Sequence, residues 1–379
     1  MAASCDAIVI GAGPAGLAAA AALRARGLDA VILEKSHSVG SVWRRHYDRL
    51  HLHTDRARSG LPGLAMPKAY GRYPSRAQVV EYFEAYAAKF ALKPVFGAEV
   101  SSIRRDGGLW RAEAGAETRV APVVVVATGW ADFPYSPSWP GMKDFVGPVL
   151  HSSRYRNPAP FAGKRVLVVG YGNSGAEIAL DLCEAGIDVT LAVRSPVNVV
   201  PRELFGLPIL FFPMAEQWLP PRAADALNAP AIRLAVGSLA AAGLRKAAKG
   251  PLRTIVEDGR PPLIDVGTLA AIRAGRIKVR GDLASFTPNG VAFAQSPAEP
   301  FDAVILATGF RPDLRALLPG AKGVLTKSGA PLVSGRATAE PGLFFCGAIL
   351  SPIGQLRQIA IEAVAIAETA AKAAAPRAA

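Results

Sequence analysis

The residues best suited to chemistry are two glycine-rich segments. Residues 11–16 read Gly-Ala-Gly-Pro-Ala-Gly, and residues 170–175 read Gly-Tyr-Gly-Asn-Ser-Gly. In turns of this kind the first glycine allows a sharp bend, and the second lets backbone N–H groups approach a pyrophosphate at the positive end of the next helix. Either segment alone is weak evidence, but both stand between an apolar run and a helix-like run. The chain is therefore expected to bind two nucleotides.

The elements around these turns are those that a phosphate-binding turn requires. Residues 6–10 and 165–169 each begin with one charged residue and continue as apolar runs that are typical of buried parallel strands. Pro14, directly after the second glycine of the first turn, and Ser174, two residues after that of the second turn, favour the start of a helix. Each turn is thus predicted to connect a strand to a helix.

Two further predicted strands end in the same way. Residues 123–129 and 303–309 are apolar runs that both finish with Ala-Thr-Gly. In open parallel sheets, ligands gather at the carboxyl ends of strands. The duplicated ending suggests that the chain leaves a first domain, makes a second one and returns, with re-entry expected at about Phe301.

The residue after the second strand of each unit indicates which nucleotide binds. The strand at residues 30–33 ends on Glu34, where a carboxylate would bind ribose hydroxyls, as in FAD or NAD. The strand at residues 188–193 ends on Arg194 and Ser195, and an arginine favours the 2′-phosphate of NADPH. Arg202 is a further candidate phosphate ligand, with an ordinary surface arginine as the equal alternative.

Composition excludes several function classes. A chain of 379 residues can hold two domains. Its formal charge of +13 would suit a nucleic-acid partner, but the basic residues are scattered and no nucleic acid is expected. The apolar runs are too short or too broken to span a bilayer. Because the first strand begins almost at Met1, no signal peptide is expected, and the protein is predicted to be cytoplasmic.

The cysteines argue against thiol chemistry. Cys5, Cys183 and Cys346 are dispersed and form no CxxC motif. Neither a disulfide framework, a metal site nor a redox-active dithiol is therefore expected. Dithiol reductases that use similar nucleotide domains are thereby disfavoured.

A linker motif between the two turns carries a family resemblance. Phe145, Gly147, His151 and Tyr155 match FxGxxxHxxx(Y/F), the identifying pattern of the flavin-containing monooxygenases, which are class B flavoprotein monooxygenases. The chain resembles that family over nearly its whole length. Residues 43–54, 199–203 and 263–269 look most like its YUCCA branch and bacterial relatives, whose plant members convert an indole α-keto acid to an acetic acid.

One departure leaves the substrate open. Residues 40–43 read Gly-Ser-Val-Trp, where the family usually has Gly-Gly-x-Trp. Oxygenation of nitrogen or sulfur and oxidative decarboxylation of an α-keto acid therefore both remain as alternatives.

The resemblance implies an α/β fold of two Rossmann-like dinucleotide-binding domains, with the NADPH domain inserted into the FAD domain. The expected bounds are 1–154 for the first part of the FAD domain, 155–298 for the NADPH domain and 299–379 for the second part. Residues 201–262 depart from simple βαβ alternation, and both an apolar substrate channel and an ordinary helical core fit them.

The resemblance also implies the chemistry. NADPH reduces the flavin, O2 adds to it, and the resulting hydroperoxyflavin passes one oxygen atom to a small organic substrate. The alternative is an NADPH-dependent flavin reductase or oxidase that releases hydrogen peroxide. The expected partners are the substrate and O2, and a homodimer is left open.

Two histidines receive roles from the alignment of motifs. His53 occupies the place of an asparagine near the flavin in other members, so it is the expected hydrogen-bond donor to the hydroperoxyflavin. A structural histidine fits that position equally well. His151 is expected to order the crossing between the domains, and no general-base role is assigned to it.

The expected ligands follow from the turns, the strand ends and the resemblance. For FAD they are Gly11, Gly13, Pro14, Ala15, Gly16, Glu34, Lys35, Gly40, Trp43, Arg44, Val100, Thr128, Gly129, Gly347 and Gln355. For NADPH they are Gly170, Gly172, Asn173, Ser174, Gly175, Arg194, Ser195 and Arg202.

Overall fold

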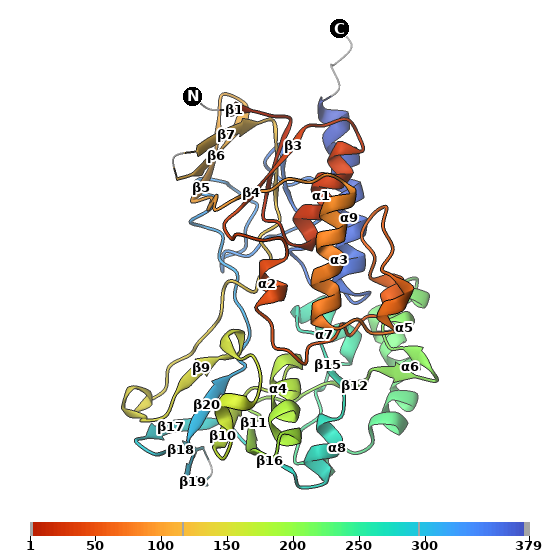
Figure 1. Cartoon of the computed structure of the whole chain (residues 1–379). Helices are drawn as coiled ribbons and strands as arrows, with labels where there is room; N and C mark the ends of the chain where they lie inside the picture. The colour runs from red at the N-terminus through yellow and green to blue at the C-terminus, as the bar shows by residue number, and fades with distance from the viewer. Residues whose placement is uncertain (1–2, 116, 295, 375–379) are drawn as a thin grey trace. The chain divides into compact units, whose positions relative to one another are not determined.

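The computed structural model describes residues 3–115, 117–294 and 296–374 and divides into two compact units (Figure 1). Unit 1 takes in the described residues of Met1–Arg44, Thr54–Phe133 and Arg311–Ala379. Unit 2 consists of Arg45–His53 and Pro134–Phe310.

Unit 1 contains a parallel sheet with the strand order β21-β8-β2-β3-β4. The bounds are β2 Ala7–Ile10, β3 Ala30–Glu34, β4 Val95–Phe96, β8 Val123–Val126 and β21 Leu343–Phe345. A second sheet has the order β1-β7-β6-β5, with β1 Ala3–Ser4, β5 Ser102–Asp106, β6 Leu109–Ala114 and β7 Glu117–Ala121. The helices are α1 Pro14–Arg24, α2 Ser41–Arg44, α3 Arg76–Lys89, α9 Gln355–Ala374, and the 3-10 turns η1 Arg56–Arg58 and η2 Lys68–Tyr70.

Small and apolar side chains explain the core of unit 1. Strands β2 and β8 are buried along their whole length, as continuous apolar runs in a parallel sheet must be. Helix α1 is rich in alanine, is buried from Ala15 to Leu23 and packs against α9. Helix α3 begins with a reciprocal capping box between Ser75 and Gln78.

Unit 2 contains a second parallel sheet with the order β16-β11-β10-β20-β9. The bounds are β9 Val149–His151, β10 Arg165–Val169, β11 Asp188–Ala192, β16 Ile277–Arg280 and β20 Ala303–Leu306. Smaller ladders are β12 Val199–Pro201 with β15 Leu263–Asp265, β13 Glu203–Leu204 with β14 Leu207–Pro208, and β17 Leu283–Thr287, β18 Gly290–Phe293 and β19 Ser296–Pro300.

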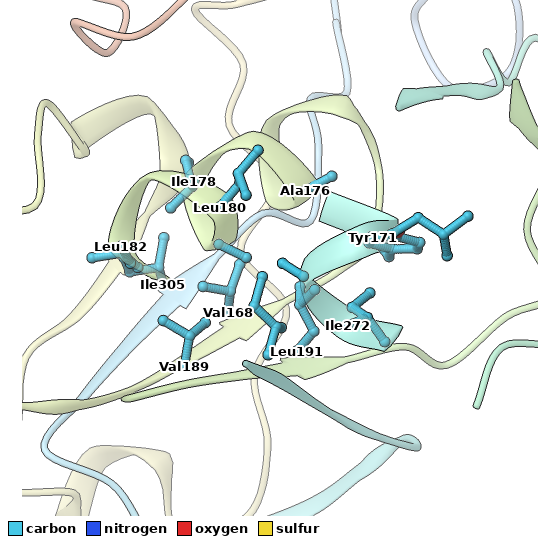
Figure 2. Packing of buried hydrophobic residues seen from close by; sticks show 14 of the residues in the cluster. Val168, Tyr171, Ala176, Ile178, Leu180, Leu182, Val189, Leu191, Ile272 and Ile305 are labelled. Carbon is cyan, nitrogen blue, oxygen red and sulfur yellow. The ribbon is translucent and has the colours of Figure 1, made fainter. Parts of the chain in front are cut away.

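Two helices of unit 2, α4 and α8, pack against this sheet, and other helices are formed by residues 201–262. The bounds are α4 Asn173–Glu184, α5 Phe211–Ala215, α6 Pro221–Val236, α7 Pro251–Asp258 and α8 Thr268–Arg273, with the turns η3 Met142–Asp144, η4 Ser152–Arg154, η5 Ala159–Phe161 and η6 Ala240–Ala242. Figure 2 shows α4 packed on the sheet through Ile178, Leu180 and Leu182, which meet Val168 and Ile305 in one buried cluster.

The unit boundaries differ from the expected ones. Strand β20 pairs with β10 in the sheet of unit 2, so unit 1 resumes at Arg311 and not at about Phe301. Unit 2 also begins earlier than residue 155, at Pro134, because β9 pairs with β20. In addition, the segment Arg45–His53 belongs to unit 2 although the chain on either side of it belongs to unit 1. Long-range pairing of this kind leaves no local signal in the sequence.

Residues 201–262 form short helices and one cavity. Of helix α6 only Ala224 and Val236 are buried. A cavity of about 910 Å³ is lined by α6, by residues 197–199 and by the chain from Val236 to Pro251. The region is therefore neither a fully buried helical core nor a simple βαβ unit.

Candidate dinucleotide sites

The first glycine turn lies at the carboxyl end of β2 and has a geometry that fits a phosphate. Gly11 has φ +105°, and a Cβ there would lie 2.8 Å from the carbonyl oxygen of Ala127. A Cβ at Gly16 would lie 1.8 Å from the carbonyl oxygen of Gly11. The fold itself therefore requires these two glycines. A Cβ at Gly13 would meet no described atom within 4 Å, so the protein leaves that space open for a ligand.

The start of α1 presents backbone donors to that space. Gly13 is the N-cap residue and supplies no side-chain cap, and the first turn contains no acidic side chain. The first N–H groups of a helix have no partner within the helix and attract anions. The turn is thus suited to the pyrophosphate of a dinucleotide.

Glu34 stands at the same edge of the sheet. Its side chain is 6% exposed, and its Oε2 and Oε1 accept backbone N–H groups of Ala12 (2.6 Å) and Ser36 (2.8 Å). A carboxylate has about four acceptor sites, so two remain for hydroxyl donors. The structure therefore brings Glu34 to the turn, as a ribose ligand would need to be.

The other predicted FAD residues make a variety of contacts within unit 1, and one of them, Gly40, contacts this turn. The backbone N–H of Gly40 donates to the Ala12 carbonyl over 3.0 Å, which places the segment before α2 next to the turn. Trp43 packs edge-on against Phe83, and Arg44 pairs with Glu84. Lys35 pairs with Asp132 over 3.2 Å, and Val100 packs in the core of unit 1.

The loops after β8 and β21 meet at Gly347. The indole N–H of Trp130, just after Thr128 and Gly129, donates to the Gly347 carbonyl over 3.1 Å, and so does Nε2 of Gln355. The start of α9 is therefore beside Gly347.

The sequence analysis did not identify Glu362, which holds Gly347 in place through a hydrogen bond. Glu362 is 4% exposed on the buried face of α9, and its Oε2 accepts the N–H of Gly347 (2.7 Å) and the hydroxyl of Ser334 (2.6 Å). The available signal was a carboxylate among Ile359, Ala363 and Ile366 on one apolar helix face. Such a carboxylate must be hydrogen-bonded, and here it holds a loop.

The second glycine turn repeats the geometry of the first in unit 2. Gly170 has φ +106°, and a Cβ there would lie 2.5 Å from the carbonyl oxygen of Ala307. A Cβ at Gly175 would lie 2.0 Å from the Gly170 carbonyl oxygen, whereas one at Gly172 would meet no described atom within 4 Å. Gly172 is again the N-cap residue without a side-chain cap. Both turns thus keep open the space above their second glycine.

The residues around the second turn differ from those around the first. Arg194 and Ser195 follow β11 and are exposed, and no carboxylate stands where unit 1 has Glu34. Asn173 uses its side chain to hold β15, because Oδ1 accepts the Ile264 N–H (2.8 Å) and Nδ2 donates to the Pro262 carbonyl. Arg202 lies between β12 and β13.

Side-chain contacts hold the segment Arg45–His53 against helix α4. Nε2 of His53 lies 2.5 Å from Oε1 of Glu177, whose side chain is buried. Tyr47 is hydrogen-bonded to Ser174 and Glu177; burial, with the Glu177 charge as a second cause, holds the Tyr47 pKa well above its ordinary value. Arg49 pairs with Glu184, the last residue of α4. His53 therefore has a carboxylate partner directly after the second glycine turn.

The linker motif has a structural basis in unit 2. Phe145 packs edge-on against Phe286, and a Cβ at Gly147 would lie 2.4 Å from the Asp302 carbonyl oxygen. The backbone N–H of Ser153 donates to Nδ1 of His151 (3.1 Å), so Nε2 carries the proton and donates to the Gly309 carbonyl (3.0 Å). Burial lowers the pKa of His151. His151 is thus a neutral histidine that ties β9 to the loop after β20.

Tyr155 completes the motif. Its ring is buried, and its hydroxyl donates to Oδ2 of Asp181 on α4 over 2.8 Å. Burial and the hydrogen bond to Asp181 raise the pKa of Tyr155. The aromatic residue at this place of the motif therefore holds helix α4 of unit 2 in position.

The thiols are not arranged for redox chemistry. All three cysteines are free, and Cys346 is buried. Burial raises the pKa of Cys5 to about 11 and that of Cys346 well above its ordinary range, whereas reactive thiols have lowered values. Among the described residues there is no group of three His, Cys, Asp or Glu that could hold a metal ion. Within the same residues, no helix has both the length and the apolarity needed to cross a bilayer.

Comparison with known proteins gives a consistent result. Residues 8–201 match the family model described as pyridine nucleotide-disulphide oxidoreductase. The chain is 45% identical over 328 residues to indole-3-pyruvate monooxygenase YUCCA1 of Oryza sativa subsp. japonica, which covers 85% of this chain and 81% of that protein. It is 40% identical over 335 residues to indole-3-pyruvate monooxygenase YUCCA6 of Arabidopsis thaliana, which covers 86% and 80%.

A solved structure agrees with these relatives. The flavin-containing monooxygenase from Stenotrophomonas maltophilia is 30% identical, with a TM-score of 0.72, and the alignment covers 97% of this chain and 99% of that one. The match to a disulphide oxidoreductase model reflects the shared nucleotide-binding fold, since this chain has no paired thiols. The chain therefore belongs to the family of flavin-dependent monooxygenases that includes the YUCCA enzymes.

Proposed function

We propose that the first turn binds FAD and the second binds NADPH. The observation that carries this proposal is the pair of matched turns, in which the fold leaves space above Gly13 and above Gly172. The residues after the second strands differ in charge: Glu34 suits the ribose hydroxyls of FAD, and Arg194 suits the 2′-phosphate of NADPH. Lys35, Thr128, Gln355 and the other predicted ligands named above belong to the same proposal.

The residues of the protein would bind and orient the cofactors, and the cofactors would supply the redox chemistry. Bound NADPH provides a hydride, and the reduced flavin activates O2. The N-terminus of α1 and Glu34 would hold the adenosine diphosphate part of FAD. The N-terminus of α4 and Arg194 would hold that of NADPH. This division explains why the chain needs no metal site or nucleophilic triad.

The proposed substrate is an aromatic α-keto acid. The relatives that are 45% and 40% identical are named indole-3-pyruvate monooxygenases, and the alignments cover most of both chains. In the proposed reaction the α-keto acid, O2, NADPH and a proton give the shortened carboxylic acid, CO2, water and NADP⁺. One oxygen atom of O2 enters the acid and the other becomes water. No observation on the structure favours nitrogen or sulfur oxygenation over this reaction.

The test is a labelled turnover of the flavin-loaded protein with indole-3-pyruvate and NADPH under ¹⁸O2. We expect one ¹⁸O atom in the indole-3-acetic acid product and one NADPH consumed per product. Hydrogen peroxide in amounts equal to the NADPH consumed, without labelled acid, would favour the flavin reductase or oxidase instead. Absence of any flavin binding by the purified chain would overturn the proposal entirely.

A further inference from the structure

We propose that Arg245 binds the 2′-phosphate of NADPH together with Arg194 and so sets the preference for NADPH over NADH. This inference rests on the proposed function, in which the second turn binds NADPH. Arg245 lies 51 residues beyond Arg194, within the part of unit 2 that departs from βαβ alternation.

A side-chain contact brings the two arginines together. Nη2 of Arg245 donates a short hydrogen bond to the carbonyl oxygen of Arg194. The backbone fixes this approach, because the Val197 N–H donates to the Arg245 carbonyl (2.8 Å) and the Ala247 N–H donates to the Val197 carbonyl (3.0 Å). Val197 and Lys246 form a parallel bridge. The guanidinium of Arg245 thus reaches back to Arg194 from a segment with a defined register.

The charges at this place are not neutralised within the described residues. Arg194 and Arg245 are both exposed, and neither guanidinium has a carboxylate partner there. A guanidinium has five N–H donors, and Arg245 uses one of them on a neutral carbonyl. A phosphate dianion bound beside the Arg194 backbone would attract the Arg245 guanidinium and could accept its remaining N–H donors. The pair is therefore suited to a phosphate monoester.

The position along the fold selects the 2′-phosphate in particular. Arg194 is the second residue after β11, and in doubly wound folds this is where the 2′ position of the adenosine ribose is recognised. Arg202, the other arginine predicted from the sequence, follows β12, so several extended residues separate it from Arg194. Arg245 reaches Arg194 directly although it is far away in the sequence.

The experiment measures binding of 2′,5′-ADP and of 5′-AMP to the flavin-loaded protein by titration calorimetry. Arg245→Met should weaken the binding of 2′,5′-ADP about tenfold, because one charged hydrogen bond is lost, and should leave the affinity for 5′-AMP within about twofold of that of the unaltered protein. The affinity of Arg245→Lys for 2′,5′-ADP should fall between those of Arg245→Met and the unaltered protein, because lysine keeps the charge without the planar donor pair.

Lys246→Met is the matched control. Lys246 is the next residue and is exposed, and neighbouring side chains on an extended segment point to opposite sides. This variant removes the same charge and should leave both affinities within about twofold. Retained flavin content and an unchanged circular dichroism spectrum show that each variant is folded. In steady-state assays, Arg245→Met should raise the KM for NADPH and leave the KM for NADH unchanged.

The outcomes separate the two proposals. An unaltered protein that binds 5′-AMP as well as 2′,5′-ADP contradicts the assignment of NADPH itself. A protein that prefers 2′,5′-ADP, loses the preference in Arg194→Met and keeps it in Arg245→Met contradicts only the role of Arg245. Equal losses in Arg245→Met and Lys246→Met that disappear at high salt would also overturn it, because they indicate a general positive field.

Discussion

The imidazole of His53 and the carboxylate of Glu177 meet at 2.5 Å, between Nε2 and Oε1. Glu177 is on α4, two residues beyond the last glycine of the second turn, and is 4% exposed. A ring nitrogen that faces a carboxylate carries a proton. Nδ1 is then the only ring nitrogen left for another partner, and it donates a hydrogen bond only when the ring is doubly protonated. The expected role of His53 as a donor to flavin-bound oxygen therefore depends on Glu177.

His53→Ala should increase the hydrogen peroxide released per NADPH consumed, if His53 has that role. Glu177→Gln should cause part of the same increase, because it keeps a hydrogen-bond acceptor for the ring but makes that acceptor neutral. Asp188→Asn changes an exposed carboxylate of the same unit, which pairs with Lys278, and should have no effect on peroxide release. Equal peroxide release by all four proteins would leave His53 with a structural role only.

Glu177→Ala should lower the free energy of unfolding by about 2 kcal/mol. It leaves the ring of His53 and the buried hydroxyl of Tyr47 without an acceptor, and a buried donor without a partner costs about this amount. Denaturant unfolding of the flavin-loaded protein measures the change. A loss below about 0.5 kcal/mol would show that residues 45–53 are not held by this contact.

Gly13→Ala and Gly172→Ala should each remove one cofactor and leave the fold intact. Both glycines have negative φ, −76° and −93°, and an added Cβ meets no described atom within 4 Å, so alanine fits the chain without strain. The methyl group then occupies the space that a pyrophosphate needs. Gly13→Ala should purify without flavin, and Gly172→Ala should keep flavin but not be reduced by NADPH in the absence of O2.

Gly281→Ala is the control for this pair. It also adds a Cβ that meets no described atom within 4 Å, but it follows β16 and belongs to neither turn. It should keep both the flavin and its reduction by NADPH. If Gly13→Ala retains flavin at the level of Gly281→Ala, the assignment of the first turn is contradicted.

His151 should make stability depend on pH. Burial lowers its pKa in the folded state, so the unfolded chain takes up the proton first. The contribution of His151 to the free energy of unfolding is complete above the ordinary histidine pKa of 6.5 and is lost as the pH falls below that value. The free energy of unfolding, measured from pH 8 to pH 5, should fall less steeply for His151→Gln. The exposed His51→Gln should keep the slope of the unaltered protein, and identical slopes for all three would contradict the prediction.

Tyr171→Phe should be neutral or should stabilise unit 2 by about 1 kcal/mol. Tyr171 lies in the second turn with its ring in the buried cluster of Figure 2, and its hydroxyl has no hydrogen-bond partner among the described residues. Burial raises the pKa of this hydroxyl, with the charge of Asp265 as a second cause. Removing an unsatisfied buried hydroxyl avoids its desolvation cost. A destabilisation above about 1 kcal/mol would indicate that the hydroxyl has a partner in solution.

Local sequence patterns were sufficient to predict the structural elements whose conformation depends on neighbouring residues. The two glycine turns, the capped helix α3 and the alanine-rich helices were predictable because strands, turns and helix starts depend on residues within one or two turns of the chain. The linker motif was found in the same way, and its resemblance to a family indicated the class of enzyme. The carboxylate of Glu362 could have been flagged from its apolar helix face, but its partner Gly347 could not.

The sequence by itself therefore determined the two glycine turns, the difference in charge between Glu34 and Arg194, and the family. Only the tertiary structure decided that residues 45–53 belong with unit 2, that His53 pairs with Glu177, and that Arg245 reaches Arg194. Each of these contacts joins residues 51 or more positions apart. Because such contacts depend on how strands pair and helices pack, and not on neighbouring residues, one sequence without its fold does not specify them.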